Sequence, residues 1–163
     1  MFDQFVPTWD ESTTLDAAFE EAVALAERLI RRYVARALAE VKLAGIVAAA
    51  VEAQVDAPIV VVPWKGDGTE IVARLAESTT TAQFAVFETS AGEWAAQAVP
   101  PVRGSFKQRC PFPEAWAWKR HGDLAAATGV EDAIFSHGYG FFACAGSKAG
   151  AVALANLALA AKG

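Results

Sequence analysis

The sequence predicts an α/β protein of the α+β type, with a small, mostly antiparallel sheet packed with long N-terminal helices and a C-terminal helix. Apolar residues recur at helical spacing over the first fifty positions, and short β-branched and aromatic runs follow from position 59. With 163 residues, 54% of them hydrophobic, the chain can bury one core. We expect a single domain, 1–163, with a helical arm over 1–55 and a sheet-containing core over 56–163.

The first third of the chain is predicted to be helical. Thr13 and Thr14 precede the first apolar position as helix-capping residues do, and arginines lie beside the apolar stripe rather than within it. Glu27 stands four residues before Arg31, which favours a solvated, ion-paired face over a nucleic-acid patch. A second helix over 43–54 is expected after a break near Gly45. The stripe comprises Leu15, Phe19, Val23, Ala26, Ile30, Tyr33, Ala37 and Val41.

Strand signals begin after Pro58. The run 59–62 is β-branched and typical of a buried strand, and 63–68 is expected to be a turn that carries Trp64 and Lys65. The later elements are a helix over 69–77, antiparallel strands over 83–88 and 94–99, an irregular loop over 100–113, short helices over 114–119 and 122–128, strands over 133–137 and 141–144, and a helix over 147–161.

The charge distribution restricts the classes of partner. The formal net charge is −5, which disfavours generic nucleic-acid binding, although residues 101–163 hold seven basic and four acidic groups. The cations of that segment alternate with aromatic residues, a mixture that can hold phosphate and stack a base. A solvated basic loop packed on aromatics is the alternative interpretation.

Catalytic signals are weak. The two histidines, His121 and His137, have no acidic pair at ligand spacing, so we expect no metal site and no cofactor. Ser136 and His137 are adjacent in a predicted strand, which disfavours a nucleophilic triad because their side chains point to opposite faces. Cys110 and Cys144 are expected to be buried free thiols. With no secretory signal or membrane-spanning segment expected, we predict a cytoplasmic protein.

Two short segments are candidates for ligand contact. The final helix opens with Gly146-Ser147-Lys148, where free backbone N–H groups, a hydroxyl and an ammonium group can receive an anion. Most helices begin in this way without binding a ligand. Pro63-Trp64-Lys65 is either a ligand clamp or a tryptophan that closes the end of the core.

The order of these landmarks resembles the C-terminal half of the Myg (melanocyte proliferating gene) family, metal-dependent phosphoesterases of the DHH superfamily. The resemblance runs from about Phe5 to Ala161. It is carried by Pro7-Thr8-Trp9, Phe19-Glu20-Glu21-Ala22-Val23, Pro63-Trp64-Lys65, Trp94, Gln97-Ala98-Val99-Pro100, Ser105-Phe106, Arg109, Pro111-Phe112-Pro113-Glu114-Ala115-Trp116, Thr128-Gly129-Val130, Ile134-Phe135-Ser136-His137, Gly140-Phe141 and Gly150-Ala151.

The resemblance implies that the two halves of such relatives have different functions. In such relatives an N-terminal half, which this sequence lacks, carries the metal ligands, and members of the family hydrolyse RNA from the 3′ end. A glycine-rich segment with a histidine contacts substrate phosphate, and it corresponds to 137–150 here. His137 and Gly140 match that segment, whereas Ala143 and Cys144 stand where paired glycines are expected. Loss of those glycines limits the approach of backbone to phosphate.

We therefore expect a stand-alone module, non-catalytic alone, that binds a phosphorylated small molecule, a nucleotide or short RNA. The alternatives are the substrate-binding subunit of a split metal-dependent phosphoesterase, completed by a separate metal-binding chain, and a structural or homodimeric protein with a vestigial site. No catalytic or metal-ligating residue is predicted. The predicted ligand-binding residues are Lys65, Arg103, Lys107, Arg109, His137, Gly140, Ser147 and Lys148.

Overall fold

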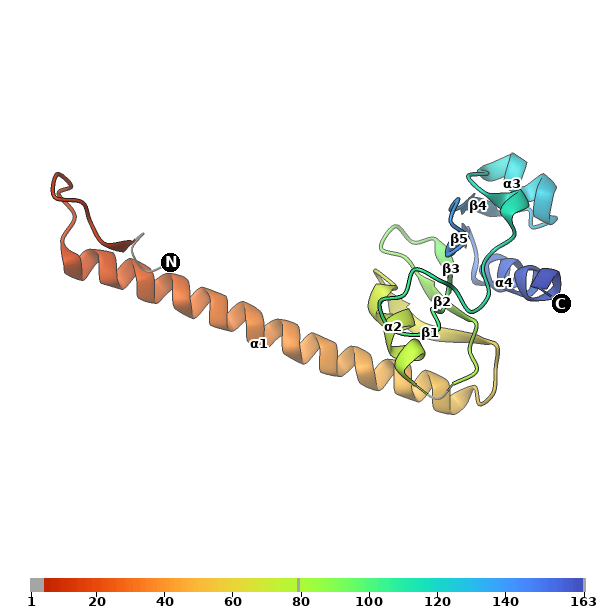
Figure 1. The fold of residues 1–163 in the computed structure, drawn as a ribbon, viewed down its shortest axis with the longest axis horizontal. Helices are drawn as coiled ribbons and strands as arrows, with labels where there is room; N and C mark the ends of the chain where they lie inside the picture. Colours follow the sequence, from red (N-terminus) through yellow and green to blue (C-terminus); the bar gives the residue numbers. More distant parts are fainter. Residues whose placement is uncertain (1–4, 79, 163) are drawn as a thin grey trace. The chain divides into compact units, whose positions relative to one another are not determined.

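The computed structural model describes residues 5–78 and 80–162 (Figure 1). The chain divides into two compact units, Met1–Lys42 and Leu43–Gly163. Helix α1, Leu15–Ala53, begins in the first unit and ends in the second. No helix among the described residues combines the length and the apolar character needed to cross a bilayer.

The beginning of α1 follows the predicted capping. The Thr14 hydroxyl accepts a hydrogen bond from the Ala17 backbone N–H at 3.2 Å, which satisfies one of the free donors of the first turn. The predicted pair of Glu27 and Arg31 is present at 3.8 Å. Both side chains are exposed, so the pair contributes well under about 1 kcal/mol.

The expected break near Gly45 is wrong, because α1 is continuous through that position. One glycine costs a helix only about 1 kcal/mol relative to alanine. Leu43, Val47 and Ala50 lie on the same side of α1 and are buried in a hydrophobic cluster of the second unit. Their burial holds this part of the helix in place despite the glycine.

The second unit contains a five-stranded mixed sheet in the order β1-β2-β3-β5-β4. β1 and β2 are parallel and joined through helix α2, whereas β3, β5 and β4 continue the sheet in antiparallel pairs. The mostly antiparallel sheet and the α/β class are thus confirmed. The strands are β1 Ile59–Lys65, β2 Phe84–Glu88, β3 Trp94–Ala98, β4 Ala133–Ser136 and β5 Phe142–Ala145.

The expected turn over 63–68 is shorter than predicted. Strand β1 continues through Pro63 and Trp64 to Lys65, which pairs with Glu88 of β2. Pro63 is exposed and follows the regular pairs of β1, at a register shift, where a missing N–H is tolerated. Only Gly66 to Gly68 separate β1 from α2, Thr69–Glu77.

Helices cover both faces of the sheet. Along β2, Phe84 and Val86 belong to one hydrophobic cluster, whereas Ala85 and Phe87 belong to the other, as the alternation of a strand requires. The first cluster includes α4, Lys148–Lys162, together with Leu124 of α3, His121–Thr128. The second includes α2 and the last turns of α1. The sheet is therefore the middle of three layers.

The long loop between β3 and α3 is irregular, as predicted. Its residues 99–113 contain no helix or strand, and the 3-10 turn η2, Glu114–Trp116, follows it. Cys110 and Phe112 anchor the loop because both are buried in the cluster beneath α4. Cys110 and Cys144 are buried free thiols, as expected. The anchored loop leaves residues 100–109 to line a groove at one end of the sheet.

Candidate functional site

A groove of about 1010 Å³ opens beside the ends of β3 and β4. Four segments build it: the first turns of α2, the end of β3, the 100–109 loop, and the turn that follows β4. Volumes of several hundred to about 1000 Å³ are usual for small-molecule sites. The lining residues are Thr69, Val72, Ala73, Gln97, Ala98, Pro100, Gly104, Ser105, Phe106, Gln108, His137, Tyr139 and Phe141. The lining is thus mostly apolar, with a few convergent amide, hydroxyl and imidazole groups.

His137 lies in this groove within a cluster of aromatic rings. Its ring centroid is 4.3 Å from that of Phe141, 4.7 Å from Trp118 and 5.5 Å from Tyr139. The backbone N–H of Tyr139 donates a hydrogen bond to His137 Nδ1 at 3.2 Å. A neutral imidazole that accepts at Nδ1 carries its proton on Nε2. Nε2–H is therefore the group of His137 that is left for a ligand.

The backbone around His137 is tightly specified. Trp118 has a φ of 63°, unusual for a tryptophan, and its indole fills the space beside Gly138, where a Cβ would lie 2.0 Å from a ring atom. Gly140 has a φ of 66°, and a Cβ there would lie 2.9 Å from the carbonyl oxygen of Phe112. The glycines of the Gly138-Tyr139-Gly140 turn thus serve close packing, and their geometry keeps Tyr139 at the rim.

Two aromatic rings of the groove are unusually exposed. Phe106 is 101% exposed and Tyr139 is 81% exposed, although most large apolar side chains of the second unit are buried. Solvent-facing rings on a fixed backbone are the surfaces on which nucleobases stack. In the same groove, Gln108 Oε1 is buried without a hydrogen-bond partner, while Gln108 Nε2 donates to the Phe106 carbonyl at 3.2 Å. A buried acceptor without a donor favours a ligand that supplies one.

The predicted ligand-binding residues do not form one site. The cross-strand pairs align Lys65 with Glu88, Glu88 with Trp94, and Trp94 with Ala145, so these residues share one end of the sheet. We call this the α4 end, because Ser147 and Lys148 follow Ala145 there. Gln97 pairs with Phe142 at the opposite end, the groove end, where the His137 N–H donates to the Phe142 carbonyl at 2.9 Å.

Lys65 is separated even from the two residues at its own end. Strands β2 and β3 lie between β1 and β5, which places Lys65 about 14 Å from Ala145 at the usual strand spacing. Ser147 and Lys148 are in turn a full strand length from His137. The predicted ligand-binding residues are therefore divided among the end of β1, the start of α4 and the groove end of the sheet. Their charges do not combine at one site.

The cations predicted to bind phosphate mostly have partners within the protein. Lys65 forms an ion pair with Glu88. The Arg103 guanidinium lies 2.7 Å from Glu70 and 3.3 Å from Glu77 on α2. The hydrogen bond to Glu70 and the charges of both carboxylates raise the pKa of Arg103. These arginine and lysine charges are neutralised locally, which weakens their pull on an anion.

Arg109 is a structural residue. Its guanidinium donates to the carbonyl oxygens of Thr80 and Ala82, both at 2.9 Å, and to that of Ala76 at 3.5 Å. These bonds tie the groove loop to the end of α2 and to the segment before β2. Arg109 thereby supports the shape of the groove, and three of its hydrogen bonds are already made within the protein.

Lys107 differs from Lys65 and Arg103, which are paired with carboxylates. It follows Phe106 in the groove loop, is exposed, and has no ion pair with any residue that the structure describes. Its backbone N–H donates to the Ser105 hydroxyl at 3.0 Å, which fixes the turn beneath it. Lys107 is not itself a lining residue, but it stands between the lining residues Phe106 and Gln108 and is therefore an unpaired cation adjacent to the groove.

The N-termini of α2 and α4 are occupied by the protein's own carboxylates. Asp67 Oδ1 accepts hydrogen bonds from the Thr69 N–H at 3.0 Å and from the Thr69 hydroxyl at 2.9 Å. At α4, the Ser147 hydroxyl accepts from the Gly150 N–H at 3.0 Å, and a Cβ on Gly150 would lie 2.2 Å from Asp132 Oδ1. A phosphate at either helix would meet a carboxylate, so the predicted Ser147 and Lys148 anion site is disfavoured.

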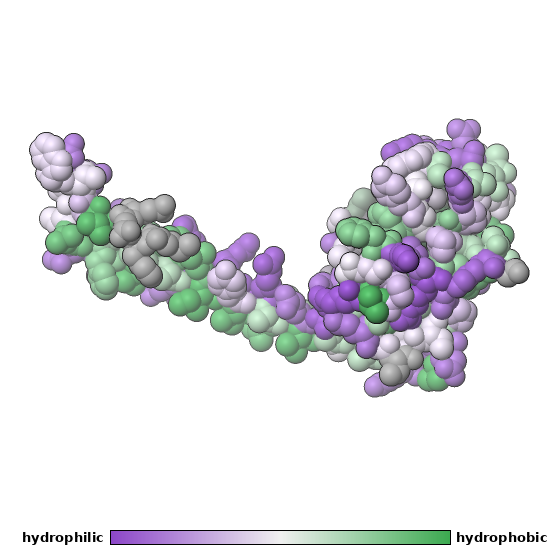
Figure 2. Space-filling model, in the orientation of Figure 1, coloured by the Kyte–Doolittle hydropathy of each residue, from purple (hydrophilic) through white to green (hydrophobic). Residues whose placement is uncertain are grey.

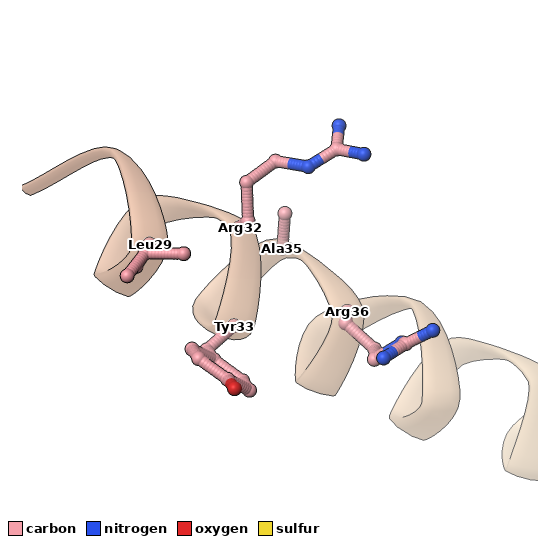
Figure 3. Close-up of a pocket in the computed structure, with 5 residues that line it drawn as sticks. All are labelled: Leu29, Arg32, Tyr33, Ala35 and Arg36. Carbon is pink, nitrogen blue, oxygen red and sulfur yellow. The ribbon is translucent and has the colours of Figure 1, made fainter. Parts of the chain in front are cut away.

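A second concavity lies on α1 in the first unit. It is lined by Leu29, Arg32, Tyr33, Ala35 and Arg36 of that one helix. Figure 3 shows Leu29 and Tyr33 on one side of the helix, with Arg32 and Ala35 on the other. Side chains that diverge from a single helix do not enclose a ligand. Among the described residues there is also no group of three or more His, Cys, Asp or Glu side chains that would hold a metal ion.

Sequence reasoning missed most of the groove. Gln97 was part of a family landmark but was given no role, and Gln108 was not named, because a lone glutamine carries no spacing signal. Tyr139 was assigned to a turn, and Trp118 to a short helix within the segment whose aromatic residues and cations could bind a nucleotide. The usable signal was the density of aromatic residues in two loops, 106–118 and 135–141, which the fold brings to the same end of the sheet.

Comparison with known proteins identifies the family. A model of the MYG1 exonuclease family, described as "Uncharacterised protein family (UPF0160)", matches residues 1–159, and the chain belongs to this family. The MYG1 exonuclease of Rattus norvegicus is 33% identical over 98 residues, which are 60% of this chain and 26% of the relative. The MYG1 protein of Dictyostelium discoideum is 33% identical over 93 residues, or 57% and 28%.

The human relative gives a similar picture. The MYG1 exonuclease of Homo sapiens is 35% identical over 77 residues, which are 47% of this chain and 20% of the relative. The chain thus covers about a quarter of the length of the curated relatives it matches. No solved structure matches the chain significantly. The resemblance inferred from sequence landmarks is confirmed at the level of the family.

Proposed function

We propose that the second unit binds a nucleotide, or one terminal nucleotide of a short single-stranded RNA, in the groove. The observation that carries the proposal is that two exposed rings, Phe106 and Tyr139, line the same groove as a buried acceptor without a partner, Gln108 Oε1. Rings of this kind stack on bases, and the acceptor matches an exocyclic amino group of a base. The relatives named MYG1 exonuclease support a nucleic-acid ligand.

The polar groups of the groove have distinct roles in this proposal. His137 Nε2–H donates to a phosphate or ribose oxygen, since Nδ1 is held by the Tyr139 backbone. Lys107, which is exposed and has no ion pair with any described residue, lies next to the lining residue Phe106 and neutralises a phosphate. Gln97 adds an amide to read the base edge. The base supplies most of the binding energy, and the phosphate supplies a smaller part.

The proposal for this chain is restricted to binding. It corresponds to the expected module that binds a ligand without catalysing a reaction. The segment that matches the exonuclease relatives spans only about a quarter of their length. A role as the substrate-binding part of a larger or split phosphoesterase is compatible with the same groove. Addition of a separate chain with the metal ligands would then produce hydrolysis, whereas the affinity of this chain for RNA would change little.

The test is a fluorescence titration of a labelled four-nucleotide RNA and of a mononucleotide, at two salt concentrations. His137→Ala and Lys107→Ala are the site variants, and Lys148→Ala at the α4 end is the matched control. We expect each site variant to weaken binding and the control to bind as the wild type does. One phosphate contact predicts a shallow salt slope of about −0.7. Binding that is absent, or equal in all four proteins, would refute the groove as the site.

A further inference from the structure

We propose that the first unit pairs with a second copy of this chain through an antiparallel contact between the two α1 helices, centred on Ala26. This inference is independent of the groove and goes beyond the proposed function. Figure 2 shows hydrophobic residues along one side of α1 and hydrophilic residues along the other. Four large side chains of the hydrophobic side are exposed: Leu15 at 71%, Phe19 at 65%, Ile30 at 62% and Tyr33 at 69%.

An exposed apolar stripe of this length indicates a surface that another element covers. An amphipathic helix normally buries its apolar stripe against a neighbouring element. Within the first unit, Ala18 is the only described residue that is fully buried. The described parts of this unit therefore leave most of the α1 stripe open.

Between Leu15 and Ala37, seven apolar positions of α1 are symmetric about Ala26, with Ala22 used in place of Val23. Leu15 and Ala37 lie eleven residues on either side of Ala26, Phe19 and Tyr33 lie seven, and Ala22 and Ile30 lie four. In an antiparallel pair with its two-fold axis at Ala26, each of these seven residues therefore faces an apolar residue of the partner. Phe19 faces Tyr33 of the second copy, whereas Leu15 and Ile30 each face an alanine. The alanines near the axis permit close approach of the two backbones.

Charged residues on the two sides of Ala26 have opposite signs. Residues 15–25 carry three carboxylates and no cation, whereas residues 27–37 carry four arginines and one carboxylate. An antiparallel pair lays the acidic half of each helix along the basic half of the other, with the helix axes about 8 to 10 Å apart. Opposite charges that border the contact attract each other, and this attraction weakens as salt shortens the Debye length below its value of about 10 Å at 0.1 M. A parallel pair would lay like charges together, so the charge pattern selects one orientation and favours a second copy as the occupant.

Cross-linking tests the orientation. Ala26→Cys is expected to link to itself across the two-fold axis, and Phe19→Cys is expected to link to Tyr33→Cys when the two variants are mixed. Phe19→Cys alone should not link. The natural cysteines are buried, so the wild type serves as the unreactive control. Self-linking of Phe19→Cys without linking of Ala26→Cys would overturn the antiparallel arrangement.

Molar mass tests the association itself. Light scattering during gel filtration should give twice the 17.2 kDa of one chain at about 100 μM protein. Tyr33→Asp should return the mass to that of a monomer, whereas Ala35→Asp should leave the dimer intact, because Figure 3 shows these side chains on opposite sides of α1. A wild type that is monomeric at this concentration, or a dimer insensitive to Tyr33→Asp, would refute the proposal. Circular dichroism of each variant confirms that α1 remains helical.

Discussion

The two ends of the sheet in the second unit carry functional groups in opposite states. At the α4 end, Lys65 pairs with Glu88, and Asp132 lies at the N-terminus of α4. At the groove end, Phe106 is fully exposed and Gln108 Oε1 lacks a partner. At the α4 end, Lys65 is thus neutralised and a carboxylate lies beside the helix N-terminus, although Lys148 has no ion pair with a described residue. A lysine or arginine in the sequence therefore indicates an anion-binding site only when no carboxylate of the folded protein pairs with it.

The largest expected effect is the low reactivity of Cys144, which is buried near the α4 end. Burial, together with the nearby Glu93 carboxylate, raises the pKa of Cys144 to about 12 from an ordinary 9.0. A raised pKa favours the neutral thiol, so at pH 8 the thiolate fraction falls about a thousandfold below that of an ordinary cysteine. Titration with a thiol reagent should find Cys144 unreactive in the folded protein and reactive in urea. Fast modification at pH 8 without denaturant would show that this end is open.

Arg109→Ala should give the largest loss of stability among the predicted ligand-binding residues. It removes three charge-assisted hydrogen bonds to carbonyl oxygens, and we expect the free energy of unfolding to fall by about 3 kcal/mol. Urea denaturation measures this change. The exposed Lys107→Ala is the control and should cost less than about 0.5 kcal/mol. If Arg109→Ala were as stable as the control, its structural assignment would be wrong.

Phe106→Ala separates binding from stability at the groove end. The ring is fully exposed, so its removal should change the free energy of unfolding by less than about 0.5 kcal/mol. Loss of one stacked base should weaken RNA binding by about 1–3 kcal/mol, or roughly fivefold to a hundredfold or more. The RNA titration of the variant provides the measurement, and unchanged affinity would remove Phe106 from the site. Val102→Ala, also exposed in this loop but outside the groove lining, is the matched control.

Gly140→Ala tests the turn that sets the rim. A positive φ of 66° and a Cβ 2.9 Å from the Phe112 carbonyl oxygen should together cost about 1–2 kcal/mol. Gly104→Ala has a similar φ of 78° but meets no atom within 4 Å, so it should cost less. Thermal unfolding of the two variants isolates the steric part. Equal losses would show that close packing at Gly140 is unimportant.

Much of the fold followed from local pattern. The β-branched run at 59–62, the hairpin about Gly92 and the closing helix were all predicted, because strand alternation and helical spacing are encoded by neighbouring residues. The continuity of α1 through Gly45 was not predicted. It depends on burial of Leu43 and Val47 by distant elements, which a propensity argument does not contain.

The site was less predictable than the fold. His137 lines the groove, but Lys65, Ser147 and Lys148 lie at the other end of the sheet, since strand order, rather than proximity in sequence, decides which residues meet. The partners of Arg103 and Arg109 are contributed by α2 and by the segment before β2, more than twenty residues away. Only the folded chain shows that these arginines are already engaged.

Chemical-shift mapping of a mononucleotide tests the central claim most directly. In a ¹⁵N-labelled sample, the side-chain amides of Gln97 and Gln108 and the backbone N–H of Tyr139 should shift in a saturable manner. The N–H groups of Ser147 and Lys148 at the α4 end should not move. Shifts confined to Ser147 and Lys148, with the groove amides unmoved, would contradict the account and restore the helix N-terminus as the binding site.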